Sequence, residues 1–511
     1  MFTSLTPKGK LLRNSKRYIH SVKTSNISSV PDFTKYSPTR PINEELTPYI
    51  YETLQGYRSE SRYVNPQHYY HNDTVLIKDY LQKSPHAVSL TQLAQYYDDS
   101  TTLTKHKIIN SGRFVKEELA IRMAHKIHKL QKLPFNVVNN FHLAQVYESY
   151  YNIFERFRKY PRIKTIDDNY KFCEFIKRIL QDFNSLNLPH LVMGALECNV
   201  LDLLPREEID SLLSSLLRAR ISRRLIVEEH LSITANYLSG KKENTLVLGD
   251  IFQECVAMDY LIRASKISEK FVQDMYFDSI PLPKLIVEGD TKLKFYFLPT
   301  HLEYILGEIL RNIYEATIKD YIRKGIDKPE PIVVTIVKTE DSFLFRFADK
   351  AGGILHHDEN IWSFGKSKER SIESLENFHK LPGLQTVAIY DHLYQSSSSS
   401  SPSSLKAFKV DGNDQMTRTN AANRPYLHTS LEAMGHPNLT KGAYKFEMPL
   451  IEMLERAPRY KLGIGLAMCK TYAEYWNGDL TLNSIPGYGT DTTLKLGNLM
   501  AHTNKLQLDK V

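Results

Sequence analysis

The segment His301–Asn312 has the sequence HLEYILGEILRN and predicts a helix that continues to about Arg323. Glu308 and Asn312 stand four residues apart in it and therefore share one helix face. The carboxamide oxygen of an Asn is a hard, neutral ligand that suits Mg²⁺. A Glu one turn away can accept the proton of an attacking hydroxyl. Taken alone, such a pair is more often a solvated helix face than a catalytic one.

Strand patterns follow this helix along the chain. Val333, Thr335 and Val337 recur at a period of two, as do Phe343, Phe345 and Phe347 after a turn at Glu340 and Asp341, which predicts a β-hairpin. Near the C-terminus, a predicted helix at 465–476 is followed by predicted strands at 480–483 and 492–496. The second half of the chain is therefore predicted to be an α/β sandwich.

The region upstream, from about Ser111 to Ser239, has a helical pattern throughout. Each predicted helix must bury its apolar stripe against its neighbours, which predicts a four-helix bundle and an α+β class for the whole chain. The four stripes contain Val115, Leu119, Met123, Ile127 and Leu130; Leu143, Val146, Tyr147, Tyr150, Ile153, Phe154 and Phe157; Phe172, Phe175, Ile176, Ile179 and Phe183; and Leu212, Leu213, Leu216, Leu217, Ile221 and Leu225.

Most of the formal charge of +8 lies in the first 31 residues, which hold six basic side chains and no acid. Without this leader the net charge is about +2, so no bulk electrostatic attraction to nucleic acid is expected. A basic leader rich in Ser and Thr is typical of a mitochondrial transit peptide, with a disordered basic tail as the alternative. Neither a run of about 18 apolar residues nor a C-x-x-C pair occurs, so we expect no membrane span, zinc site or disulfide framework.

Between 366 and 458 the periodic patterns are lost around a low-complexity run, Ser396–Ser401. Such a composition cannot bury enough apolar surface to offset its ordering entropy. We therefore expect a long flexible insertion inside the second domain, of the kind that serves as a lid or stays disordered.

Familiar nucleotide signatures are absent from the sequence. Gly365-Lys366-Ser367 imitates the end of a phosphate-binding loop, but Asn360 replaces the glycine that the loop requires. Neither H-R-D nor D-F-G occurs, which excludes the ordinary protein-kinase machinery. Gly463 and Gly465 imitate a dinucleotide fingerprint, whose third glycine position is Met468.

Three further short elements have residue types that suit a nucleotide. Asp349, at the end of the hairpin, can accept a hydrogen bond from an exocyclic amino group, and Gly353 beside it permits close backbone approach. Gly463 and Gly465 open a helix whose exposed N–H groups favour phosphate. Thr490 follows a turn and can bond to the base through its hydroxyl. The competing interpretations are a plain β-turn, an ordinary helix start and a simple hairpin turn.

In this order and spacing, the four elements resemble the N box, the two glycine boxes and the G-T box of the GHKL ATPases and kinases. Upstream, Arg220–His230 and Glu117–Ala124 look like the last and first bundle helices of the mitochondrial pyruvate and branched-chain ketoacid dehydrogenase kinases. The segments 476–480 and 489–491 are similar to their C-terminal strand pair. The resemblance covers about 110–365 and 459–497.

This resemblance implies an ATP- and Mg²⁺-dependent serine kinase that inactivates a ketoacid dehydrogenase complex. By carry-over, Glu308 is the general base, Asn312 the Mg²⁺ ligand and Asp349 the adenine reader. The remaining nucleotide contacts implied are Gly353, Gly463, Gly465 and Thr490. Phosphoryl transfer of this kind depends mostly on positioning and charge neutralisation.

The leader composition and the resemblance together predict a mitochondrial matrix location and a domain order. The order is a transit peptide at 1–26, a partly helical extension at 27–109, the bundle at 110–240 and a GHKL-type domain at 250–500 interrupted by the insertion at about 366–458. Implied partners are the dehydrogenase component and the lipoyl-bearing acyltransferase core of the pyruvate dehydrogenase complex, with a homodimer or a heterodimer with a related kinase. A branched-chain kinase, a weakly active nucleotide-binding scaffold and a histidine kinase using His230 stay open as alternatives.

The sequence departs from the family pattern at several site positions. Arg311 replaces a lysine, Glu315 an arginine, Lys350 an arginine, and both Ala351 and Lys461 replace glycines. Glu315 places an acid near the expected site, whereas Lys461 adds a cation suited to phosphate. No C-terminal Asp-Trp pair is present, so the dimerisation mode typical of the family is not implied.

Overall fold

The computed structural model describes residues 64–65, 67–70, 72–89, 103–239, 251–276, 280–354, 361–380, 450, 453–454, 456, 461–501 and 507–508. All of them belong to one compact unit of the chain. The predicted leader and the serine-rich run at 396–401 lie outside the described residues.

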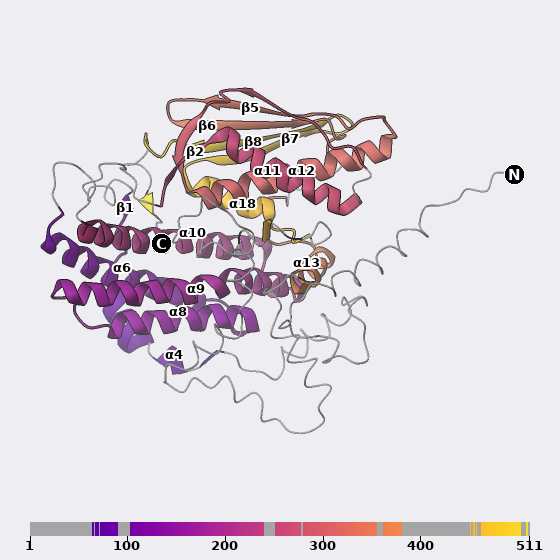
Figure 1. The fold of residues 1–511 in the computed structure, drawn as a ribbon. Helices are drawn as coiled ribbons and strands as arrows, with labels where there is room; N and C mark the ends of the chain where they lie inside the picture. The colour runs from indigo at the N-terminus through magenta and orange to yellow at the C-terminus, as the bar shows by residue number, and fades with distance from the viewer. Residues whose placement is uncertain are drawn as a thin grey trace, which may run out of the picture. The chain divides into compact units, whose positions relative to one another are not determined.

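Long helices form the first part of the described chain. They are α6 (Lys105–Gln131), α8 (Phe141–Lys159), α9 (Ile166–Val200) and α10 (Arg206–Ser239), and they pack against one another in the lower half of Figure 1. The predicted stripes on α6, α8 and α10 are buried throughout. The α+β class predicted from the sequence is therefore confirmed in its helical part.

Local sequence sets where these helices begin. Thr165 and Asp168 form a capping box at the start of α9, in which the Thr165 hydroxyl accepts from Asp168 N and the Asp168 carboxylate accepts from Thr165 N at 2.9 Å. Asn140 caps α8 by accepting from His142 N and Leu143 N. Shorter helical elements are α4 (Gln67–Tyr70), η2 (Asn72–Leu81) and α7 (Phe135–Val138).

A five-stranded sheet forms the second part, in the order β3-β5-β6-β8-β7. The strands are β3 (Leu285–Gly289), β5 (Ile332–Lys338), β6 (Ser342–Asp349), β8 (Gly489–Gly497) and β7 (Asp479–Ile485). β3 and β5 are parallel and the other neighbours are antiparallel, which confirms the hairpin predicted between β5 and β6.

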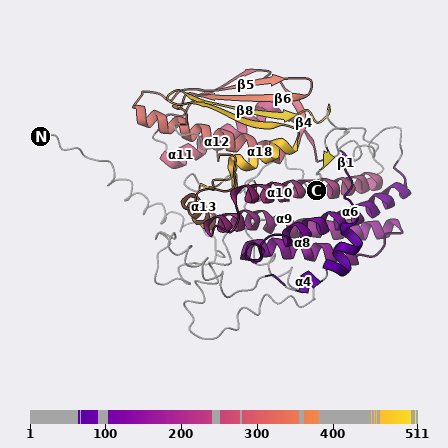
Figure 2. The same cartoon turned by 180° about the vertical axis from the view of Figure 1, so that it is seen from behind.

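Helices cover one face of this sheet, as both ribbon views show (Figures 1 and 2). They are α11 (Ala257–Tyr276), α12 (Pro299–Lys324) and α18 (Gly465–Tyr475). The core between helices and sheet contains fully buried aromatic side chains, among them Phe345, Phe347 and Trp476. A small antiparallel pair, β2 (Gln253–Val256) with β4 (Lys294–Phe297), lies at the side of this layer.

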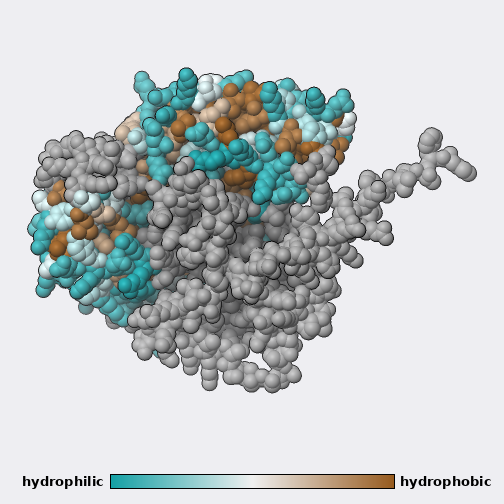
Figure 3. All heavy atoms as spheres, viewed as in Figure 1, coloured by the Kyte–Doolittle hydropathy of each residue, from teal (hydrophilic) through white to brown (hydrophobic). Residues whose placement is uncertain are grey.

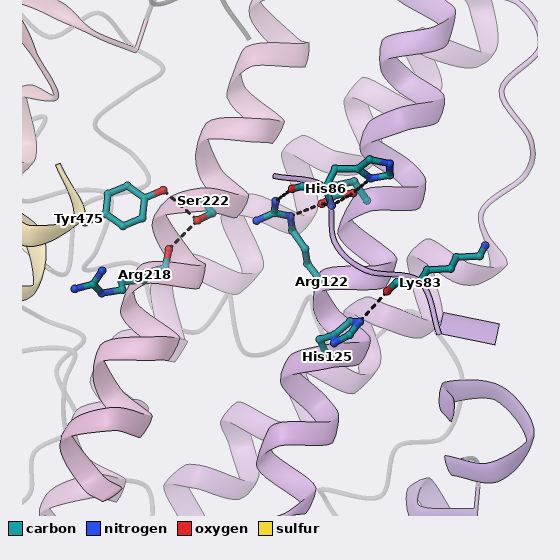
Figure 4. Close-up of polar contacts among 8 residues, drawn as sticks. Lys83, His86, Arg122, His125, Arg218, Ser222 and Tyr475 are labelled. Carbon is teal, nitrogen blue, oxygen red and sulfur yellow. Dashed lines mark hydrogen bonds and ion pairs between the residues drawn. The ribbon is translucent and has the colours of Figure 1, made fainter. Parts of the chain in front are cut away.

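Several contacts join the helical part to the sheet part. Ser222 of α10 lies 3.0 Å from the Tyr475 hydroxyl at the end of α18 (Figure 4), and Arg218 pairs with Glu474 at 2.8 Å. On α10, the Asp210 carboxylate accepts from Phe364 N at 2.6 Å. These bonds connect α10 to α18, which the second glycine box opens, and to the segment around Phe364.

A helix occupies part of the stretch expected to lack regular structure. It is α13 (Lys368–Lys380), which packs against α9 and buries Ser371, Ser374 and Asn377. The expectation of a structureless segment is therefore wrong for these residues. A contact with α9 explains part of this difference between prediction and structure. The Asn199 amide of α9 donates to Ser371 Oγ at 2.6 Å and so holds the first turns of α13 against α9.

The segment before α6 is fastened to that helix by a buried ion pair. Glu118 accepts from both the backbone N and the ring of His86, and Arg122 donates to Glu118 and to the His86 carbonyl (Figure 4). Immediately after it, β1 (Val88–Ser89) pairs with β9 (Gln507–Leu508) near the C-terminus. This strand pair joins the segment before α6 to the C-terminal part of the described chain.

The described surface shows scattered apolar groups. In Figure 3 hydrophobic residues are interspersed with hydrophilic ones over the described part of the face in view. The large hydrophobic side chains that are exposed come from many different elements: Phe135, Leu238, Ile262, Ile322, Val337, Ile485, Tyr488 and Met500. Within the described residues, none of the helices is both long and apolar enough to cross a membrane.

Candidate nucleotide and phosphoryl-transfer site

Helix α12 carries the two residues that the sequence singled out first. Pro299 stands in its first turn, and Gly325 ends it with a left-handed φ of 61°. Glu308 is buried, with its side chain 2% exposed, whereas Asn312 one turn later is exposed. The same helix therefore holds the proposed base in the protein interior and the proposed metal ligand at the surface, one turn away.

The carboxylate of Glu308 is held by two partners from distant parts of the sequence. Arg456 donates both terminal nitrogens to it, Nη1 to Oε1 and Nη2 to Oε2, the second at 3.1 Å. Gly465, the first residue of α18, lies so close that an added Cβ would fall within 3.0 Å of Oε2. The structure thus brings the predicted base and one predicted phosphate-binding glycine into direct contact.

Arg311, next to the exposed Asn312, points into the protein and fastens the segment 453–456. Its guanidinium donates to the Leu454 carbonyl and to the Arg456 carbonyl, each at 2.9 Å. It also lies over the Phe271 ring, 4.0 Å from the centroid. Burial, together with the nearby Arg456 charge, lowers the pKa of Arg311 to about 9, so it stays a cation at neutral pH.

The second glycine box opens α18 in a geometry that requires glycine. Gly463 has a φ of 70°, which side chains rarely adopt, and an added Cβ would lie 3.0 Å from Ser374 Oγ on α13. The residue before the helix, Ile464, provides no side-chain cap. The first N–H groups of α18 are therefore not used by a capping side chain, which is the arrangement that binds anions at a helix start.

Two of the departures from the family pattern pair with each other. The Lys461 ammonium lies 2.7 Å from Glu315 Oε1 on α12, and Lys319 contacts the same oxygen. Burial acts to raise the pKa of Glu315, but the two lysines outweigh it and hold that pKa below its ordinary value. The acid that replaces a family arginine is therefore compensated by the lysine that replaces a family glycine.

Asp349 and Thr490 face each other across β6 and β8. Asp349 is buried, and its Oδ1 accepts from Ala351 N at 3.0 Å. Burial raises the pKa of Asp349 above its ordinary value, against the lowering effect of backbone hydrogen bonds from Ala351 and Thr490. A buried carboxylate of this kind needs further donors, which is the property expected of a residue that reads an amino group.

The first glycine box and the β7–β8 turn are interlocked. Gly353 has a φ of 67°, and an added Cβ would fall within 3.0 Å of the Ile485 carbonyl. The Ser484 hydroxyl accepts from Ile354 N at 2.7 Å and lies 3.0 Å from the Thr490 hydroxyl. Two backbone bonds, Gly352 N to the Tyr488 carbonyl and Gly487 N to the Gly352 carbonyl, complete the unit.

Helix α12 connects the two groups of predicted residues. Glu308 contacts Gly465 at the start of α18. The end of α12 instead approaches the Asp349 group, because an added Cβ at Gly352 would meet Asp320 and Arg323. Eight residues separate Asn312 from Asp320, which is about 12 Å along a helix axis. The predicted residues therefore fall into two clusters along one helix.

Sequence reasoning missed two residues of this arrangement. Arg456 was assigned to the insertion, although apolar residues at helical spacing, Leu450, Met453 and Leu454, signal a packed segment there, and all three are buried. Ser484 gave no signal, because a Ser in a strand becomes informative only once the partner strand and its register are known.

Burial excludes the third alternative, a histidine kinase with His230 as the phosphoacceptor. His230 is 1% exposed, its Nδ1 lies 2.9 Å from Ser111 Oγ, and burial lowers its pKa to about 4. A phosphoacceptor must reach a γ-phosphate. This imidazole lies between α6, α9 and α10 and acts as a packed, neutral side chain.

Known proteins are similar to this chain over most of its length. The family model described as mitochondrial branched-chain alpha-ketoacid dehydrogenase kinase matches residues 87–252. Pyruvate dehydrogenase (acetyl-transferring) kinase 2, mitochondrial, of Saccharomyces cerevisiae is 68% identical over 499 residues, covering 98% of this chain and 99% of its own. The human isozyme 4 is 21% identical over 84% of this chain and 85% of its own, and the Arabidopsis thaliana kinase is 22% identical over 78% and 87%.

Proposed function

The chain belongs to the family of mitochondrial pyruvate dehydrogenase (acetyl-transferring) kinases, and from this premise we propose that it transfers the γ-phosphoryl group of ATP to a serine of the pyruvate dehydrogenase component. The chain is a protein kinase and uses a nucleotide, as its family does. The observation that carries the proposal is the meeting of Glu308, Gly465 and the uncapped start of α18 beside the exposed Asn312. Phosphorylation turns the complex off in this proposal.

Each proposed nucleotide contact has a matching feature. The exposed Asn312 oxygen suits one Mg²⁺ coordination position, because Mg²⁺ keeps several waters and takes the rest from phosphates. Gly463 and Gly465 leave the α18 N–H groups open to phosphate oxygens. Asp349, Gly353 and Thr490 surround the position assigned to adenine. Bound Mg²⁺ and ATP would supply the transferable phosphoryl group and the charge that neutralises it.

The residues of the chain itself do the remaining work. Glu308 accepts the proton of the serine hydroxyl, and its cover by Arg456 and Gly465 keeps water away from that carboxylate. Asn312 orients the metal from the same helix, so that base and metal ligand keep a fixed spacing of one turn. Lys461, freed from Glu315, would be close enough to the start of α18 to meet a phosphate.

The fold proposal follows the same family. We assign the long helices to a four-helix bundle domain and the sheet with α11, α12 and α18 to a GHKL-type sandwich, supported by their order and by the contacts between them. The partners proposed are the dehydrogenase component and the lipoyl-bearing core of the complex, in the mitochondrial matrix. A homodimer or a heterodimer with a related kinase is part of the proposal.

A second substrate is favoured by one observation, the match of residues 87–252 to a family model named for the branched-chain enzyme. The test incubates the full chain with γ-labelled ATP and with each purified dehydrogenase component in turn. We expect acid-stable label on the pyruvate dehydrogenase component. Label on the branched-chain component alone would support the second substrate, and no label on either would overturn the kinase assignment in favour of a scaffold.

A further inference from the structure

The short segment 453–456 covers the carboxylate that the proposed function assigns as base. Arg456 touches Glu308, and the two side chains are 9% and 2% exposed, respectively. Both guanidinium nitrogens Nη1 and Nη2 engage both carboxylate oxygens, so the pair is bidentate. A pair so fully removed from water fixes the orientation of the carboxylate.

The position of this guanidinium is set by helix α12 itself. Arg311 donates to the Leu454 and Arg456 carbonyls, which anchors the backbone of the segment. Leu454 packs against the bare backbone of Gly307, where an added Cβ would come within 3.0 Å of its side chain. Arg456 also donates to the Met453 carbonyl, which holds its own side chain in place. Three neighbouring residues of α12, at 307, 308 and 311, thus bind one segment.

A cation beside Glu308 offsets the cost of removing its carboxylate from water. A carboxylate removed from water is stable as an anion only beside a compensating charge, and an acid that has taken up a proton can accept no other. The groups that face Glu308 are Arg456, Arg311 and Tyr304 together with Cys469 of α18. Among these described groups the two arginines are the cations; Arg311 donates to the Leu454 and Arg456 carbonyls, whereas Arg456 donates to the carboxylate. Arg456 therefore provides the direct compensation.

The bidentate pair still leaves room for proton transfer. A carboxylate has about four lone-pair positions, and Arg456 uses one on each oxygen. The remaining positions can accept a hydroxyl proton. The pair is thus compatible with a working base held in a fixed direction.

We propose that Arg456 is a positioning residue for phosphoryl transfer, which holds Glu308 charged and correctly aimed and thereby makes the C-terminal end of the insertion a part of the kinase site. The inference rests on the proposed role of Glu308. It assigns a function to a segment that has no counterpart among the four sequence boxes. Arg456 acts through Glu308, whose two carboxylate oxygens its guanidinium holds.

The test measures ATP affinity by calorimetry and the single-turnover transfer rate for Arg456→Met, Arg456→Lys, Glu308→Gln and the double variant. We expect Arg456→Met to leave ATP affinity within about twofold and to lower the transfer rate by about 10²-fold, the effect of a misplaced catalytic group. Arg456→Lys keeps the charge but not the fork and should recover part of the rate. The double variant should be no slower than Glu308→Gln alone, because both changes disable one unit.

A matched control comes from the buried pair of Arg122 and Glu118 on α6, whose side chains are 4% and 0% exposed. Arg122→Met removes the same kind of partner far from the site and should lower the melting temperature without slowing transfer per folded molecule. An equal loss of transfer in Arg122→Met, or an unchanged or faster rate in Arg456→Met, would overturn the inference. Normal transfer in Glu308→Gln would instead overturn the base assignment in the proposed function, so the two failures are distinguishable.

Discussion

Gly465 lies against the carboxylate of Glu308, at a distance where a Cβ on residue 465 would come within 3.0 Å of Oε2. The glycine that opens α18 is therefore required by packing against the proposed base as well as by any approach of a phosphate. Gly465 and Glu308 are in contact although they stand more than 150 residues apart in the sequence. This contact makes the second glycine box and the α12 helix a single unit.

Gly465→Ala should therefore reduce transfer more than it reduces stability. The added methyl group displaces the Glu308 carboxylate or moves the start of α18, and a shift of about 1 Å at a reacting group costs about 10²-fold in rate. Alanine is also a better helix former than glycine, which offsets part of the strain. The measurement is the single-turnover rate beside the melting temperature.

Gly325→Ala is the control for this prediction. Gly325 has a φ of 61°, but an added Cβ there meets nothing within 4 Å, so the change introduces backbone strain alone. It should lower the melting temperature and leave the rate per folded molecule unchanged. If Gly465→Ala transferred phosphate at the normal rate, the contact with Glu308 would have no catalytic meaning.

Glu308 and Asn312 are predicted to give different phenotypes, although they share one helix. Asn312→Ala removes a ligand that bridges protein and phosphates through the metal, so Mg²⁺-dependent ATP affinity should fall together with the rate. Glu308→Gln keeps the shape but cannot take the serine proton, so ATP affinity should persist while transfer falls by about 10²–10⁴-fold. Calorimetry and single-turnover kinetics separate the two outcomes.

Because Glu308 is paired with the buried Arg456, its variant needs a check on folding. A Gln at this position can still accept from the guanidinium, although it leaves the charge uncompensated. Rates are therefore to be expressed per folded molecule, from the fraction that retains ATP binding. Loss of ATP binding in Glu308→Gln, with Asn312→Ala unaffected, would contradict the assignment of roles.

Local sequence patterns were enough to predict the helices and strands that carry the candidate site residues. The helix that carries Glu308, the hairpin that ends at Asp349 and the helix opened by Gly465 all lie where periodicity and glycine placement predicted them. The pairing of Asp349 with Thr490 follows from strand register, which the sequence alone leaves open.

The contacts that the sequence could not predict join residues far apart along the chain. From the sequence, Glu315 is an acid near the expected site; in the structure it pairs with Lys461, 146 positions later. The apolar spacing of Leu450, Met453 and Leu454 signals a packed segment before Arg456, but not that its guanidinium pairs with Glu308. Such pairs depend on tertiary packing, to which single-sequence periodicity is blind.

Asp349 is predicted to decide which base is bound. An amide at this position can still accept from Ala351 N, so Asp349→Asn should keep the loop intact. A hydrogen bond to a charged acceptor is worth about 1.5–3 kcal/mol and one to a neutral acceptor about 1, so ATP affinity should fall by about tenfold. Unlike a carboxylate, the amide can also donate a hydrogen bond to the carbonyl oxygen that ITP has in place of the adenine amino group. The ratio of the ATP affinity to the ITP affinity should therefore fall.

The control for this change is Asp491→Asn, on the strand that faces Asp349. Asp491 is paired with Arg346 at the surface, where ion pairs contribute little. It should leave both ATP affinity and the ATP-to-ITP ratio unchanged. An unchanged ratio in Asp349→Asn would remove Asp349 from base recognition.

His230 is predicted to make the stability of the chain depend on pH. Burial lowers its pKa to about 4 in the folded chain, whereas a His in the unfolded chain has a pKa of about 6.5. Below pH 6.5 the unfolded chain therefore binds a proton that the folded chain rejects until about pH 4, so stability falls as the pH falls through this window. The full difference corresponds to about 3 kcal/mol of unfolding free energy.

Two variants separate the titration of His230 from its packing. His230→Asn removes the titrating ring but keeps an acceptor for Ser111, so the unfolding free energy from urea titrations should lose about one proton's dependence on pH between 6.5 and 4. Ser111→Ala removes the hydrogen-bond partner and leaves the ring, so it should lower stability while the slope with pH remains. A His230→Asn protein that kept the wild-type slope would show that other groups cause the acid sensitivity, since an amide cannot titrate in this range.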